Sequence, residues 1–193
     1  MQACSIALKN EIISRIKPII ASWNNVSDIY AISLYVSDKY DNPCEPTFTL
    51  GYNTENNYKN AISVASSPLE ARWNYAFWMQ NSELVFGEEE TAEIVKNWIL
   101  SLNLPYFTYH EMFKTNMSDN VPDIEFEKIT CEFVSVLISV VKELHETGVI
   151  KSAFSKNVPI IIHELEYYDK IGQQNIEANG RFLVQELIDF INE

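Results

Sequence analysis

The chain has 193 residues, 47% of them hydrophobic and 12% aromatic, which is enough to bury the core of one domain over residues 1–193. Its 27 acidic and 14 basic residues give a net charge of −13 at pH 7. A body of this charge repels phosphate backbones and anionic lipid, so nucleic acid and membranes are poor candidates for partners and a basic protein is a better one. The same charge would also suit a protein that is acidic only for solubility.

Cysteine usage and the apolar pattern indicate a cytoplasmic protein. Cys4, Cys44 and Cys131 are odd in number and widely spaced, which argues against a disulfide framework and a zinc ribbon. Charged residues interrupt the apolar pattern at the N-terminus, so we expect no secretory signal. The longest apolar stretch, residues 133–141, contains two serines and is too short to span a bilayer.

The first predicted element is a helix whose apolar residues recur at helical spacing, namely Ile6, Ile13, Ile16, Ile20 and Trp23. Pro18 falls inside this pattern, so the helix either kinks there or starts again.

Residues 28–36 alternate as a strand does. A second strand, with Phe48, Leu50 and Tyr52 on one face, follows a polar loop, and we expect the two strands to pair as a hairpin.

The middle of the chain shows helix-start signals. Asn53 or Thr54 is suited to cap a short helix. The sequence from Ser67 to Glu70 forms a capping box with a proline at the first helical position, which predicts a helix through Phe77. Residues 73–78 also fit a strand, but the start signal favours the helix. A further helix follows the glutamates after Gly87, because acids suit the first turn.

The last third of the chain carries the best helix. Residues 123–147 place a continuous apolar stripe on one face, and Gly148 is the expected left-handed stop. Residues 105–122 have little pattern and predict a long connection. Residues 159–162 predict a buried strand, and two helical patterns follow over 165–178 and 182–191. The order indicates an α+β fold, or a small three-layer arrangement, in which several helices cover a small mixed sheet of three or more strands.

Sequence motifs for catalysis are missing. The chain has 5 glycines, none within four residues of another, so it has no P-loop and no dinucleotide fingerprint. None of its 3 histidines has a second histidine four residues on, which is the helical zinc-protease spacing. We therefore expect no cofactor, no bound metal and no enzymatic activity.

The most enzyme-like group is His163, Glu164 and Glu166, directly after the predicted buried strand. Strand ends often hold binding groups, and these side chains are suitable ligands for a hard or borderline metal. The alternative is that the two glutamates only begin a helix and favour its dipole.

Two segments are candidates for binding a partner protein. The acidic one comprises Glu83, Glu88, Glu89, Glu90 and Glu93, which would complement lysine and arginine or would only cap a solvated helix. The aromatic one contains Trp73, Tyr75 and Trp78, which would anchor an interface where exposed or would pack in the core.

Three segments resemble a bacterial family of uncharacterised domains of about this length: residues 70–81, 30–35 and 160–168, which read EARWNYAFWMQN, YAISLY and IIIHELEYY. Members of such families are similar to immunity proteins of polymorphic toxin systems. The resemblance covers most of the chain, carries no catalytic motif, and implies a protein that binds and neutralises a toxin.

Three functional hypotheses follow. The first is an immunity-type protein that blocks a cognate toxin, and a basic toxin domain fits the charge because nucleases must hold phosphates. The second is a small-ligand or metal-dependent enzyme that uses His163, Glu164 and Glu166. The third is a structural protein that associates with itself through the aromatic segment. The sequence leaves the oligomeric state open.

Overall fold

A computed structural model describes residues 3–111 and 123–193. Its centre is a four-stranded mixed sheet in the order β3-β2-β1-β4. The strands are β1 (Ile29–Asp38), β2 (Pro46–Thr54), β3 (Leu84–Phe86) and β4 (Ile160–His163). β2 pairs antiparallel with both β1 and β3, whereas β4 runs parallel to β1. The α+β fold class and the predicted hairpin are therefore confirmed.

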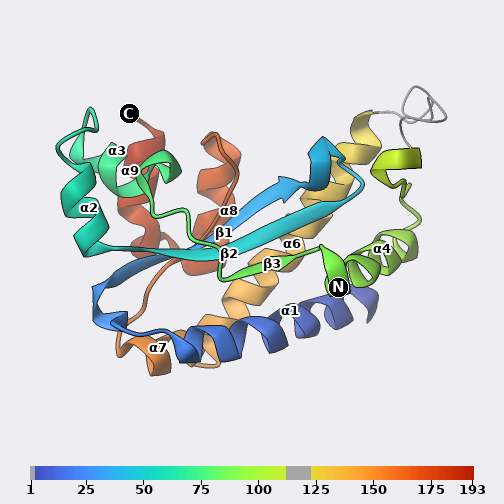
Figure 1. Cartoon of the computed structure of the whole chain (residues 1–193), viewed down its shortest axis with the longest axis horizontal. Helices are drawn as coiled ribbons and strands as arrows, with labels where there is room; N and C mark the ends of the chain where they lie inside the picture. Colours follow the sequence, from blue (N-terminus) through green and yellow to red (C-terminus); the bar gives the residue numbers. More distant parts are fainter. Residues whose placement is uncertain (1–2, 112–122) are drawn as a thin grey trace.

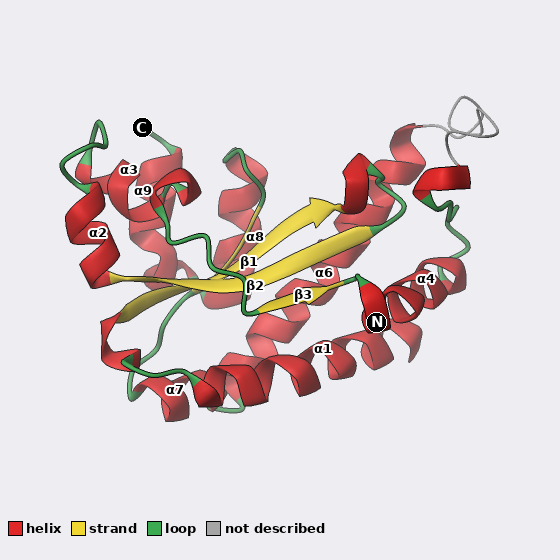
Figure 2. Cartoon of the chain, in the orientation of Figure 1, coloured by secondary structure: helices red, strands yellow, loops and turns green. Residues whose placement is uncertain are grey.

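Helices cover both faces of the sheet (Figure 1, Figure 2). The first face carries α1 (Ala3–Ser22), α4 (Ala92–Ser101), α6 (Asp123–Glu146) and α7 (Val149–Phe154). The second face carries α2 (Glu55–Ala61), α3 (Pro68–Trp73) and α9 (Gln185–Ile191). α8 (Asp169–Asn179) lies along β4. None of the described helices is long and apolar enough to cross a membrane.

Each face of the sheet has its own core. On the first face, Ile32, Leu34 and Ile162 pack with the apolar stripe of α6, where Phe133 is fully buried. On the second face, a smaller core joins β1 and β4 to the aromatic segment and α9. Strand residues alternate between the two cores, as the two-residue period of a strand requires.

Several predicted boundaries are confirmed by hydrogen bonds. The Thr54 hydroxyl accepts from the Asn57 N–H at 3.1 Å and caps α2. The Ser67 hydroxyl accepts from the Glu70 N–H at 3.0 Å and caps α3. Gly148 ends the long helix with a φ of 73°. α1 continues through Pro18 as one helix, so of the two predicted alternatives, a kink or a new start, the new start does not occur.

Other predictions are wrong. The helix from Pro68 ends at Trp73 and not at Phe77, because the Asn74 side chain accepts from the Ala76 N–H at 3.0 Å and starts a separate 3₁₀ turn (Tyr75–Phe77). Ile6 is 43% exposed, so it does not belong to the buried face of α1. The prediction missed β3, which has only 3 residues and is too short to show a period. Part of the predicted connection, residues 112–122, lies outside the described residues.

The free edge of β4 is closed by side-chain amides of α8. Asn175 accepts from the Ile162 N–H at 2.9 Å and donates to the Ile162 carbonyl at 2.7 Å. Asn179 bonds Ile160 in the same way, at 2.8 and 2.9 Å. Four residues of helix rise about 6 Å and two residues of strand about 6.6 Å, so the two spacings match. The asparagines thus supply the partners that a fifth strand would supply.

We expect Asn175→Ala to lower the free energy of unfolding by about 2–4 kcal/mol, because it leaves the buried Ile162 N–H without its partner. Urea denaturation would measure the loss. Asn97→Ala, an exposed amide on α4, is the control and should change stability by less than about 0.5 kcal/mol. Equal effects of the two changes would contradict this role of Asn175.

Candidate functional site

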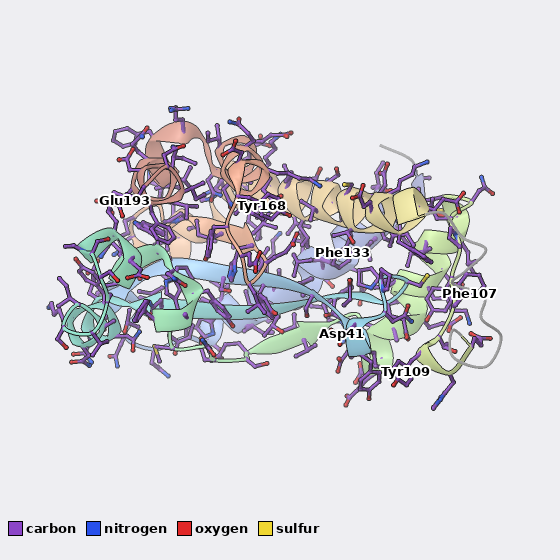
Figure 3. All side chains as sticks on the ribbon, turned by 90° about the horizontal axis from the view of Figure 1, so that it is seen from above. Asp41, Phe107, Tyr109, Phe133, Tyr168 and Glu193 are labelled. Atoms are coloured by element: carbon purple, nitrogen blue, oxygen red, sulfur yellow. The ribbon has the colours of Figure 1, made fainter. Side chains whose placement is uncertain are left out.

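A cleft of about 520 Å³ opens where the parallel strands β1 and β4 end. Its walls come from the end of β1, the turn after it, α6 and the segment that joins β4 to α8. The lining residues are Tyr35, Val36, Ser37, Asp38, Asp41, Thr130, Glu164, Leu165, Glu166 and Tyr168. Figure 3 labels two of them, Asp41 on the turn that follows β1 and Tyr168 beside the start of α8. The carboxyl ends of parallel strands commonly form ligand crevices.

Four carboxylates gather at this cleft, and we call it the acidic cleft. Asp38 and Glu164 are half-buried, while Asp41 and Glu166 are exposed. Burial, followed by the negative charges of Glu164 and Asp41, raises the pKa of Asp38 to about 6. No lysine or arginine lines the cleft within the described part of the chain. The cleft therefore favours a cation.

Tyrosine hydroxyls also reach the acidic cleft. The Tyr168 hydroxyl lies 3.2 and 3.3 Å from the two carboxylate oxygens of Glu164 and donates to them. Burial, with the charges of Glu164 and Asp41, raises the pKa of Tyr35. Both tyrosines therefore stay protonated at neutral pH and offer hydroxyl donors and acceptors beside the carboxylates.

His163 lies beneath the cleft and does not line it. Its side chain is fully buried, and the ring centroids of Tyr35, Tyr75, Trp78 and Tyr167 lie between 4.6 and 5.9 Å from its own. Nδ1 lies 2.9 Å from the Glu164 carbonyl oxygen and Nε2 lies 2.8 Å from the Ser33 hydroxyl. Because a carbonyl only accepts, Nδ1 carries the proton and Nε2 accepts from Ser33. Burial lowers the pKa of His163 to about 4.

The predicted enzyme-like group is thus divided. Glu164 and Glu166 line the acidic cleft, whereas both ring nitrogens of His163 are occupied inside the protein. Among the described residues, no group of three or more histidine, cysteine and carboxylate side chains is placed to hold a metal ion. Asp38, Asp41, Tyr35 and Tyr168, which also line the cleft, were not among the predicted site residues. The one available signal was the position of Asp38 just after the predicted strand over residues 28–36.

The structure also separates the two predicted partner-binding segments. Trp73 and Trp78 are 4% and 5% exposed and belong to the second core. Tyr75 is half-buried and stacks on Tyr35 with ring centroids 5.1 Å apart. Core packing, the alternative given above, accounts for these aromatic residues.

The predicted acidic segment lies at the opposite edge of the sheet, beside β3. Glu83 and Glu93 are exposed, and the other three glutamates line a groove of about 330 Å³. The groove is lined by Arg15, Leu84, Val85, Glu88, Glu89, Glu90 and Thr91. Arg15 pairs with Glu90 at 3.1 Å and with Glu11 at 2.9 Å. The acidic cleft and this groove are therefore two distinct surfaces.

Comparison of the chain with protein-family models, with curated proteins and with solved structures finds no match. Function is therefore inferred from the geometry and charge of these surfaces.

We expect Asp38→Asn to stabilise the fold at neutral pH. The folded-state pKa of Asp38, about 6, lies above its ordinary value of 3.8, so the folded state binds more protons in this window and loses stability as the pH rises through it. Asp38→Asn should raise the free energy of unfolding by about 1–2 kcal/mol near pH 7.5, and this increase should vanish near pH 3. Urea denaturation at both pH values would measure it, with Asp189→Asn as an exposed control. The same increase in stability at both pH values would contradict a raised pKa of Asp38.

His163 should act in the opposite direction. Its folded-state pKa of about 4 lies below the ordinary 6.5, so the unfolded state binds more protons and stability falls as the pH drops through this window. In the Asp38→Asn variant we expect the free energy of unfolding to fall by about 2–3 kcal/mol between pH 6.5 and pH 4 because of His163. Ring signals in NMR spectra of the folded protein would follow His163 directly. Protonation of its ring near pH 6.5 in the folded protein would contradict the prediction.

Proposed function

We propose that this chain is a cytoplasmic protein-binding domain that recognises a basic protein through the acidic cleft. The observation that carries the proposal is that Asp38, Asp41, Glu164 and Glu166 all line one cleft, which no described lysine or arginine lines. Lysine and arginine side chains suit such a site, because a guanidinium or ammonium pairs with carboxylates by charge-assisted hydrogen bonds.

The net charge of −13 supports a basic partner beyond the cleft itself. Complementary charge speeds the encounter of two proteins and helps to reject partners of like charge. A nuclease toxin is a basic protein of this kind, because it must hold phosphates. We therefore propose an immunity-type function, in which the chain neutralises a cognate toxin by covering it, in line with the resemblance described above.

The other two hypotheses have less support. An enzyme that uses His163 would need a ring nitrogen in the cleft, but both ring nitrogens are bonded to Ser33 and Glu164. Self-association through the aromatic segment would need exposed anchors, but Trp73 and Trp78 are buried.

The test uses the product of the adjacent gene as the probe. If the adjacent gene encodes a basic toxin, co-expression with this chain should restore growth, and the purified proteins should bind about tenfold more weakly at about 200 mM than at about 50 mM salt. The double change Asp41→Asn and Glu164→Gln should weaken binding about tenfold, since it removes two cleft charges.

Glu146→Gln is the control, because Glu146 is exposed at the end of α6 and lines neither surface. Calorimetry or biosensor titration would give the affinities. Two outcomes would contradict the proposal: an adjacent gene whose product neither impairs growth nor binds, or cleft variants that bind as tightly as the Glu146→Gln control.

A further inference from the structure

The two edges of the sheet are finished in different ways. The β4 edge is closed by Asn175 and Asn179, as described above. β3 is the end strand on the other side, and within residues 3–111 and 123–193 it pairs with β2 alone. No described element supplies amides to its outer edge. A sheet edge of this kind presents backbone donors and acceptors to any extended chain.

The hydrogen bonds of β2 indicate which residue of β3 faces outward. The Leu50 carbonyl accepts from the Glu83 N–H at 2.9 Å, and the Tyr52 N–H donates to the Asn81 side chain at 3.0 Å. Alternate residues of β2, including Phe48 and Leu50, thus direct their backbone groups toward β3. Leu84 and Phe86 stand opposite Leu50 and Phe48, so the backbone groups of Leu84 and Phe86 face β2. The N–H and C=O of Val85, which lies between them, therefore point away from the sheet.

Open space lies beside this edge. Val85 is 38% exposed and lines the groove of about 330 Å³ together with Glu88, Glu89 and Glu90. Arg15 pairs with Glu90, but the side chains of Glu88 and Glu89 form no ion pair within the described residues. The edge therefore combines free backbone groups with unneutralised carboxylates.

The turn that carries these glutamates is fixed. Gly87 has a φ of 101°, and a Cβ there would lie 2.6 Å from the Pro46 carbonyl oxygen, so only glycine fits. The Gly87 N–H donates to the Thr91 hydroxyl at 2.8 Å, which ties the turn to the start of α4. The glutamates are thus held next to the edge before any partner arrives, which lowers the entropy cost of binding.

We propose that the β3 edge binds an extended lysine- or arginine-bearing segment of a partner protein by strand addition. This inference rests on the proposed function, and it names the binding mode of that basic partner. The partner backbone bonds the N–H and C=O of Val85, and alternate side chains of the added strand place their cations beside Glu88 and Glu89. With one outward residue, the backbone bonds alone are few, so the charges supply much of the affinity.

A second copy of this chain is a poor occupant of the edge. Pairing β3 with β3 would bring the glutamates of two copies together, and each copy carries a net charge of −13. Like charges placed opposite each other destabilise a strand pair. The charge of the groove thus selects a basic strand from a different protein.

A peptide of alternating valine and lysine residues is the probe, and a peptide of alternating valine and glutamate is its control. NMR spectra should show saturable binding of the lysine peptide, with slowed hydrogen exchange at the Val85 amide. Val85→Pro removes the outward N–H while leaving the bonds to β2, and it should weaken binding about tenfold. The double change Glu88→Gln and Glu89→Gln should have a similar effect, and Glu146→Gln should have none.

These variants also separate this inference from the proposed function. Two results together would overturn strand addition, even if Val85→Pro failed to fold. The lysine peptide would leave hydrogen exchange at the Val85 amide unchanged, and the variant with Glu88→Gln and Glu89→Gln would bind this peptide with full affinity. If the basic toxin still bound and only the cleft variant weakened it, the proposed function would stand without the edge. Loss of toxin binding in the cleft variant and in the edge variants, but not in Glu146→Gln, supports both.

Discussion

The acidic cleft depends on the contact between α8 and β4. Asn175 and Asn179 bond the outer edge of β4 at two successive positions, so the helix is held in register with the strand. β4 in turn lies parallel to β1, with His163 opposite Tyr35. The carboxyl ends of both strands therefore meet, and the segment from Glu164 to Tyr168 closes over them to form the acidic cleft.

The second core explains why so many aromatic residues occur close together in the sequence. The Arg72 guanidinium lies 4.0 Å from the centroid of the Tyr30 ring and bonds both carboxylate oxygens of Glu55, at 2.9 and 3.0 Å. The Trp78 ring N–H donates to the Arg72 carbonyl at 2.8 Å. These contacts join α2, α3 and β1, so the segment around Arg72 acts as the structural link of this face.

The sequence was informative wherever a signal was local. The Thr54 and Ser67 caps, the stripe of the long helix and the apolar run of β4 were all predictable, because each depends on residues a few positions apart. The pairing of β4 with β1 was not, since an apolar run does not specify its neighbour in a sheet. The acidic cleft depends on that pairing, so Asp38 and Asp41 were missed while Glu164 and Glu166 were found. The burial of His163 could not be foreseen either, because its bond to Ser33 joins residues far apart in the chain.

Two titratable groups near the cleft have opposite effects on stability. The folded state is more stable when Asp38 is protonated, and it is more stable when His163 is neutral. Their windows overlap between about pH 4 and 6, so the two contributions partly cancel in mildly acidic solution. The fold can therefore hold a half-buried carboxyl and a buried imidazole close together without a sharp dependence on acidity.

The difference between the two sheet edges also limits stoichiometry. A chain that adds to β3 finds β4 already occupied by asparagine amides on the far side, so the sheet has no second open end. Strand addition therefore stops after one step, because a molecule that has bound a strand at β3 offers no second edge for another strand. Complexes formed in this way would be closed pairs of one partner and one copy, and the route that leads from stacked sheets to fibrils is blocked at β4.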